Sequence, residues 1–251
     1  TINNAGLIST SLIGAGSVSD ATTVVTYGGA AANVTNTGTI DGRVGLGASG
    51  GNTFLNAGAV SGSVHLGDST GGNTFTAVSG SSVVSGGGSA LAGVITGVTG
   101  VKVAAAGSVD AGTGSGAANN TLVLQNVVSG PGSGIGGAVT TLGWNQYLNF
   151  QKLTVNSGTW NLQGAWAGAG TTTLNDGLVN FNNAGSFGTG LFTANGGAIA
   201  SATAGLNLAN PFSLGGNLAL AGTNAFSLGG LLSGTGGLTV NNTGIVTLGG
   251  A

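Results

Sequence analysis

The sequence predicts an all-β fold, a β-solenoid of roughly 12 coils of about 20 residues, from three observations. Blocks of similar sequence recur at intervals of 19 to 23 residues. Apolar and polar residues alternate within these blocks, as they do in strands that bury one face. Gly supplies 55 of the 251 residues and gathers with Asn between the short apolar segments, where a coiled chain has to turn.

The clearest repeat lies in the first segment, residues 1–81. Residues 36–47 (NTGTIDGRVGLG) align without gaps with residues 56–67 (NAGAVSGSVHLG), at an offset of 20. A weaker copy of the same motif occupies residues 4–8 (NAGLI). Because one coil of a solenoid stacks on the next, equivalent residues of these blocks are expected to lie above one another.

The alternation within these blocks predicts which side chains point into the core. Successive side chains of a strand point to opposite faces, so every second residue shares a face. The aligned inward pairs are Ile40 with Val60, Val44 with Val64, and Leu46 with Leu66. His65 falls on the opposite face, above Gly45, and is expected to be a solvated surface residue.

A related pattern fills residues 141–251. Four triplets of the form Thr-x-Asn begin at Thr154, Thr173, Thr193 and Thr239. The first three follow at offsets of 19 and 20, and the last comes 46 residues later, which we interpret as two longer coils. Residues 82–140 are less regular and are expected to form irregular coils and loops. The whole chain, residues 1–251, is interpreted as one β-helix.

Asn residues at the corners of the coils are expected to have a structural role. Asn tolerates the left-handed backbone region, and its amide group can hydrogen-bond to the Asn of the coils above and below. The predicted corner residues are Asn36, Asn56, Asn156, Asn175, Asn195 and Asn241.

The charge composition restricts the function. Charged residues make up 3% of the chain, with three Lys and Arg, five Asp and a formal net charge of −2. Three scattered cations cannot neutralise a phosphate backbone, so no nucleic-acid partner is expected. Most enzyme mechanisms use clustered ionisable side chains. We therefore expect no enzyme activity, no catalytic residues and no cofactor.

Several stretches resemble a known protein family. Residues 232–251 (LSGTGGLTVNNTGIVTLGGA) resemble the autotransporter-associated β-strand repeat of bacterial type V secreted passengers. Residues 210–220 (NPFSLGGNLAL) are similar to the lead-in of such repeats, and residues 150–162 (FQKLTVNSGTWNL) resemble another passenger segment. The Asn-x-Gly-x-Ile/Val coils between residues 36 and 81 are typical of the same proteins.

The resemblance implies a right-handed parallel β-helix that is exported through the outer membrane of a Gram-negative bacterium and is extracellular or displayed at the cell surface. It also implies an N-terminal signal and a C-terminal translocator barrel in a longer parent protein, of which this chain would be a fragment. We expect a non-catalytic passenger segment that serves as an adhesin shaft or surface-display scaffold. Its candidate partner is a ligand on a host or neighbouring cell.

Two alternative functions stay open. Nearly uncharged coil ends lack the usual protection of sheet edges, so the chain could self-associate into a structural fibre or surface layer. A polysaccharide-active β-helix enzyme would need paired carboxylates, yet no Asp lies at an offset of 20 residues from another. Asp41 and Arg43 share a face and are interpreted as an exposed ion pair, and a Ser-His-Asp arrangement would have to use His65.

Metal and sugar sites find weak support in the sequence. Residues 66–73 (LGDSTGGN) are similar to calcium-binding repeats, but the single carboxylate of Asp68 is a poor site for Ca²⁺, and we expect a structural turn and no metal. Trp166 lies among small residues and is the candidate glycan contact. The remaining large aromatic residues of this region are interpreted as core fillers rather than a stacking platform. They are Trp144, Tyr147, Phe150 and Trp160.

Overall fold

The computed structural model describes residues 1–10, 21–48, 51–86, 92–94, 100–168 and 170–250. Asp20 and parts of the irregular segment 82–140 lie outside the described residues. The chain is nearly all β, with about 1% helix, which includes the 3₁₀ turn η2 (Ala117–Asn119). Its parallel sheets stack as a β-solenoid with about 11 turns of about 20 residues each, which confirms the predicted fold class.

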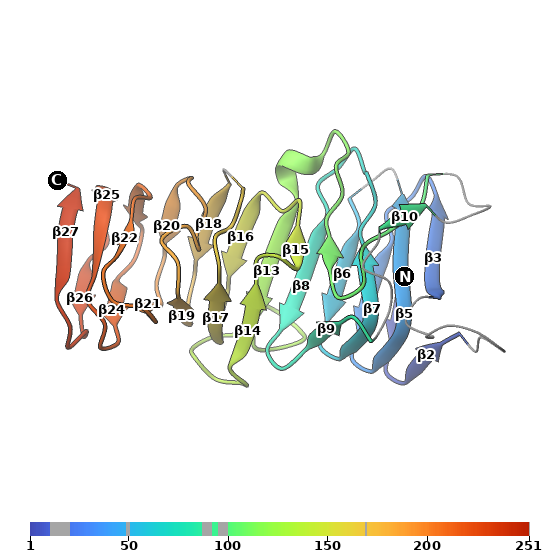
Figure 1. Cartoon of the computed structure of the whole chain (residues 1–251), viewed down its shortest axis with the longest axis horizontal. Helices are drawn as coiled ribbons and strands as arrows, with labels where there is room; N and C mark the ends of the chain where they lie inside the picture. Colours follow the sequence, from blue (N-terminus) through green and yellow to red (C-terminus); the bar gives the residue numbers. More distant parts are fainter. Residues whose placement is uncertain (11–20, 49–50, 87–91, 95–99, 169, 251) are drawn as a thin grey trace. The chain divides into compact units, whose positions relative to one another are not determined.

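The solenoid divides into two compact units, whose strands run in successive coils (Figure 1). Unit 1 comprises Thr1–Leu122 and Asn145–Phe150, and unit 2 comprises Val123–Trp144 and Gln151–Ala251. The strands of unit 1 are β1 (Ile2–Asn4), β2 (Leu7–Ser9), β3 (Thr22–Gly28), β4 (Asn33–Asn36), β5 (Thr39–Ala48), β6 (Thr53–Asn56), β7 (Ala59–His65), β8 (Thr74–Val78), β9 (Ser82–Val84), β10 (Gly93–Val94), β11 (Lys102–Val103), β12 (Val109–Asp110) and β15 (Tyr147–Leu148).

The strands of unit 2 follow the same coil pattern. They are β14 (Thr140–Gly143), β16 (Lys152–Val155), β17 (Thr159–Gln163), β18 (Thr171–Leu174), β19 (Leu178–Phe181), β20 (Phe192–Ala194), β21 (Ala198–Ser201), β22 (Leu206–Leu208), β23 (Phe212–Leu214), β24 (Leu218–Ala221), β25 (Phe226–Gly234), β26 (Leu238–Val240) and β27 (Val246–Gly250). The first passage of the chain from unit 1 to unit 2 falls within β13 (Thr121–Gln125).

Pairing in unit 1 confirms the 20-residue register. Strands β1, β4, β6 and β8 pair in that order, and β2, β5, β7, β12 and β15 form a second parallel sheet. Ile40 is the partner of Val60 and Val44 is the partner of Val64, as the alignment predicts. All four side chains are fully buried. The alternation therefore identified the inward face of β5 and β7 correctly.

Close stacking of the coils explains Gly at one corner. A Cβ atom added to Gly58 would collide with the carbonyl oxygen of Gly38, and one added to Gly38 would collide with that of Gly6. Backbone from three successive coils meets at this corner, and no side chain fits between. The Gly of the Asn-x-Gly motif is thus required by the spacing of parallel strands.

The registers of unit 2 confirm three of the four Thr-x-Asn triplets. Thr154 pairs with Thr173, and Thr173 pairs with Thr193. The placement of the fourth triplet is wrong, because Thr239 pairs with Ala219 in the other sheet, that of β24 and β26. The coil position above Thr193 is taken by Ser213, one regular offset later.

One coil of unit 1 is interrupted by an insertion, which accounts for part of the irregular segment 82–140. Strand β9 pairs with the first half of β7, and β12 pairs with its last two residues. Among the described residues between them, β10 pairs with β11 in the antiparallel direction. Coils longer than 20 residues, such as this one and the first coil, where Ile2 pairs with Val34, reduce the number of turns to about 11 from the predicted 12.

Candidate functional site

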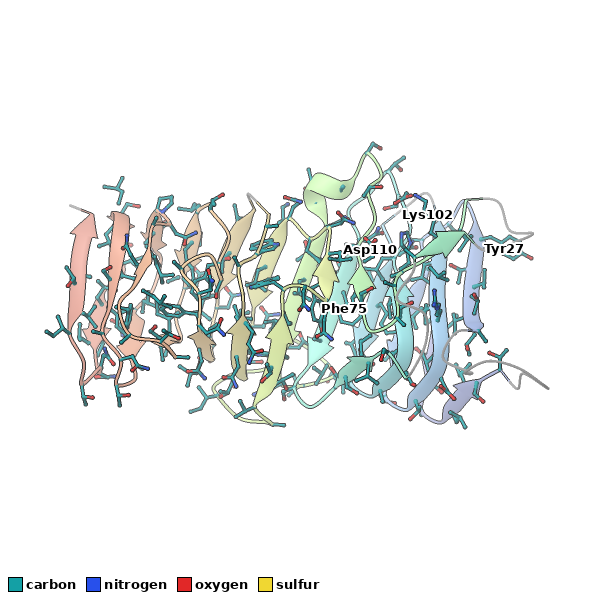
Figure 2. All side chains as sticks on the ribbon, in the orientation of Figure 1. Tyr27, Phe75, Lys102 and Asp110 are labelled. Carbon is teal, nitrogen blue, oxygen red and sulfur yellow. The ribbon has the colours of Figure 1, made fainter. Side chains whose placement is uncertain are left out.

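Four of the chain's nine Asp, Lys, Arg and His residues line one pocket of unit 1, which we call the outer pocket. They are His65, Asp68, Lys102 and Asp110. Figure 2 labels two of them, Lys102 and Asp110. The cavity has a volume of about 330 Å³, and its remaining lining residues are Ala92, Gly93, Val103 and Thr113.

The interrupted coil brings these residues together. Pairing of β12 with β7 makes Asp110 the partner of His65, although 45 positions separate them in the sequence. Residues 100–107, which we call the cover segment, lie on the outward face of β5 and β7. There Ser63 Oγ donates to the carbonyl oxygen of Ala104 at 2.8 Å. Lys102 reaches the pocket from this segment.

The His65 imidazole is buried and held in one tautomer. Its Nδ1 accepts a hydrogen bond from the backbone N–H of Gly67 at 3.0 Å, so the proton of the neutral ring sits on Nε2. Nε2 lies 4.0 Å from Asp110 Oδ2, and the side chain is 5% exposed. Burial lowers the pKa of His65, against the raising effect of the Asp110 and Asp68 carboxylates. The ring is therefore neutral at pH 7.

Asp68 anchors the cover segment to the turn that follows β7. Lys102 Nζ lies 2.5 Å from Asp68 Oδ2, and the backbone N–H of Thr113 donates to Asp68 Oδ1 at 2.7 Å. Burial by itself would raise the pKa of Asp68, but these hydrogen bonds and the Lys102 charge hold it below its usual value. Asp68 is thus ionised and its charge is matched by Lys102.

Asp110 is fixed through one carboxylate oxygen and presents the other to the pocket. Oδ1 accepts from the backbone N–H of Gly112 at 2.8 Å and from Asn149 Nδ2 at 2.7 Å. Asn149 has a φ of 60°, in the left-handed region that Asn tolerates. Oδ2 faces His65. The two hydrogen bonds to Oδ1 set the direction of the carboxylate before any ligand arrives.

The neutral His65 ring offers the outer pocket a hydrogen-bond donor rather than a base. The lone pair of His65 Nδ1 is engaged by Gly67 N–H, and Nε2 carries the proton, so the neutral ring has no nitrogen available as a general base. Within the described ranges, no group of three or more His, Cys, Asp or Glu residues is placed to hold a metal ion. The pocket therefore presents a ligand with one hydrogen-bond donor, His65 Nε2–H, and one acceptor, Asp110 Oδ2.

Two predictions of exposure on this face are wrong. His65 is 4% exposed and Arg43 is 5% exposed, so neither is a solvated surface residue, and Asp41 with Arg43 is not an exposed ion pair. The predicted parity is correct, since both side chains point away from the core. The cover segment buries them from the outside, and Arg43 Nη1 donates to the Ala104 carbonyl oxygen at 3.4 Å.

Trp166 is also buried, at 6% exposure, which corrects its prediction as a glycan contact. Its indole stacks on that of Trp144 in unit 2, with ring centroids 5.0 Å apart and an interplanar angle of 11°. Trp160 is fully buried, and its Nε1 donates to the carbonyl oxygen of Ser157 at 2.8 Å. The described aromatic residues of this region therefore leave no indole face open for a sugar.

Asn36 and Asn56 belong to a buried row in unit 1, which we call the inner ladder. Asn4 Nδ2 donates to Asn36 Oδ1, and Asn36 Nδ2 donates to Asn56 Oδ1, both at 2.8 Å. Asn36 Nδ2 also donates to the carbonyl oxygen of Ala59. Asn4, Asn36 and Asn56 are 6%, 0% and 1% exposed.

Asn156, Asn175 and Asn195 form a second row in unit 2, the outer ladder. Asn175 Nδ2 donates to Asn156 Oδ1, and Asn195 Nδ2 donates to Asn175 Oδ1, again at 2.8 Å. Asn175 and Asn195 are exposed. Asn241 is not the next residue of this row, because it follows β26 in the other sheet, where its backbone N–H donates to Leu220 O.

Three further buried Asn residues of unit 1 were not among the predicted corners. Asn73 Oδ1 accepts from the backbone N–H of Asn52 at 2.7 Å, and Asn120 Oδ1 accepts from that of Asn73 at 2.9 Å. Asn73 Nδ2 also donates to the carbonyl oxygens of Gly67 and Ala111, beside the outer pocket. The motif GGNTF, which recurs at an offset of 21, is the sequence signal that points to Asn52 and Asn73.

Comparison of the chain with protein-family models, with curated proteins and with solved structures found no match. Among the described residues there is no helix that is both long and apolar enough to cross a membrane.

Proposed function

We propose that this chain is a non-catalytic segment of a secreted β-helical passenger that serves as an adhesin shaft or surface-display scaffold outside a Gram-negative cell. The observation that carries this function is the parallel stacking of successive coils within each unit, with stacked core residues and stacked Asn side chains. The similarity of residues 232–251 to passenger repeats supports it further.

A stacked solenoid is physically suited to a scaffold. Each coil contacts only its neighbours, so length is gained by adding coils without redesigning the core. Folding that proceeds coil by coil needs neither a metal nor a disulfide, and the sequence contains no Cys. Few surface charges also mean little long-range attraction to oppositely charged partners.

Surface exposure on intact cells tests this function. In the bacterium that encodes the chain, an antibody against the purified segment should label intact cells, and protease added outside should remove the label. A gene deletion should reduce attachment to host or neighbouring cells. Antigen that is found only after cell lysis would overturn the proposal.

Self-association is a second candidate function, favoured by exposed apolar side chains on and beside β25–β27. Leu231, Ile245 and Leu248 are 59%, 75% and 51% exposed. A second copy of the chain could cover them by stacking coil on coil. A fibre or layer would be supported if the mass in solution rises with protein concentration for the parent chain but stays at the monomer value for Ile245→Ser. A constant monomer mass would contradict it.

A further inference from the structure

We infer that the outer pocket binds a neutral sugar residue, held by a hydroxyl group between His65 and Asp110. This function does not depend on the proposed scaffold role, since it concerns a ligand site on unit 1 alone. His65 supplies the key observation, because its ring has little exposed surface and its Nε2–H faces Asp110 Oδ2 across 4.0 Å, which is too long for a direct hydrogen bond. A hydroxyl group placed between these two atoms can bond to both, as a bridging water would.

The gap between the two side chains has the size of one hydroxyl oxygen. His65 Nε2 and Asp110 Oδ2 are 4.0 Å apart. If an oxygen lay about 2.8 Å from each of them, its two hydrogen bonds would make an angle of about 90°, which a hydroxyl oxygen tolerates. It would accept from His65 Nε2–H and donate to Asp110 Oδ2. An alcohol hydroxyl does both at once, whereas an ionised carboxylate oxygen has no proton to give.

Charge favours an uncharged ligand over an anion. The Asp68 carboxylate is matched by Lys102 Nζ, so the Asp110 carboxylate remains as the excess charge beside the neutral His65 ring. An acidic sugar would face this negative charge in a partly buried site, where repulsion is poorly screened. A neutral sugar hydroxyl instead gains a charge-assisted hydrogen bond.

The pocket also has the volume and the walls for more than a water molecule. A cavity of about 330 Å³ is far larger than the share of one water and lies within the range of small-ligand sites. Val103 and Ala92 line it with apolar surface that can pack against the C–H faces of a sugar ring. Fixed hydrogen bonds to Asp110 Oδ1 and His65 Nδ1 hold the polar groups in place before binding.

The single His residue provides a specific probe of the site. Protein labelled with ¹⁵N-His gives one imidazole, and its Nε2 resonance can be followed during titration with methyl glucoside, methyl galactoside and methyl mannoside. We expect a saturable shift with at least one of them, with a Kd of about 1 mM. Asp110→Asn should weaken this binding at least tenfold, while the matched change Asp41→Asn, outside the pocket, should leave it unchanged.

Other results would overturn the inference. Absence of a saturable shift with all three glycosides would mean that the pocket holds water only. Binding of glucuronate as tightly as a neutral glycoside would contradict the charge preference, and binding of glycerol as tightly would contradict a sugar-shaped site. If Asp110→Asn unfolds at the same temperature as the parent chain and binds the glycoside with unchanged affinity, Asp110 does not contact the ligand and the inference is wrong.

Discussion

The inner ladder of unit 1 and the outer ladder of unit 2 use the same residue and the same hydrogen bond in opposite surroundings. Asn36 donates an amide hydrogen to Asn56, in the following coil, and Asn175 donates one to Asn156, in the preceding coil, both at 2.8 Å. Asn36 is 0% exposed, whereas Asn175 is exposed. Strand parity explains the difference. Asn36 comes two residues after inward-facing Val34, and Asn175 comes directly after inward-facing Leu174.

Parity therefore decides how much each ladder contributes to stability. A buried amide that loses its partner keeps its desolvation cost, but an exposed amide can bond to water instead. The inner ladder is expected to be essential to the first coils of unit 1. The outer ladder, by contrast, should contribute little to the stability of unit 2.

Asn36→Ala should have the largest effect. It leaves Asn56 Oδ1 without its donor in a buried site and opens a cavity, so the free energy of unfolding of unit 1 should fall by about 2–4 kcal/mol. Asn175→Ala should cost less than about 1 kcal/mol. Chemical denaturation of both variants measures the two values, and equal losses would contradict the role of parity.

The sequence predicts the register and the inward face of β5 and β7 because equivalent residues recur every 20 positions. It does not predict the outer pocket, because the cover segment has no repeat and the insertion separates Asp110 from His65 by 45 positions. The small residues around Trp166 in the sequence predict exposure, but the fold uses small residues to bury it. Gly170 and Gly188 pack against the Trp166 indole, where a side chain would leave it no room.

The next largest difference in stability between the two units is expected at hydroxyl side chains that point away from the core. Ser63 of unit 1 is fully buried under the cover segment and donates to Ala104 O, whereas Thr193 of unit 2 is half-buried on an uncovered face. Ser63→Ala should destabilise the cover segment by about 1–2 kcal/mol, and Thr193→Ala should cost about 0.5 kcal/mol or less. Faster amide exchange around residues 100–107 in Ser63→Ala would report the loss. Unchanged exchange there would argue against burial by this segment.

Acid should weaken unit 1 through His65. Burial lowers the pKa of His65 below its ordinary 6.5, so the folded unit binds fewer protons than the unfolded chain as the pH falls below that value. Stability is therefore fully present above pH 6.5 and is lost as the pH falls through the folded pKa. His65→Gln should abolish this dependence between pH 7 and about 5. Melting temperatures of both proteins across this range test it, and parallel curves would contradict a buried neutral His65.

Added salt should have the smallest effect. Few charges are available for attraction to a partner, and exposed ion pairs are screened as the Debye length falls from about 10 Å at 0.1 M to about 3 Å at 1 M salt. Cell attachment or self-association should change less than tenfold over this range of NaCl. A larger loss would point to a charged partner.

Side-chain amide exchange tests the contrast between the ladders most directly. The Nδ2 hydrogens of Asn36 are both bonded, to Asn56 Oδ1 and to Ala59 O, in a fully buried site. NMR of the intact chain should show their exchange with solvent slowed by at least about a hundredfold relative to those of exposed Asn175, because exchange requires the coil to open. Similar exchange at Asn36 and Asn175 would contradict the account.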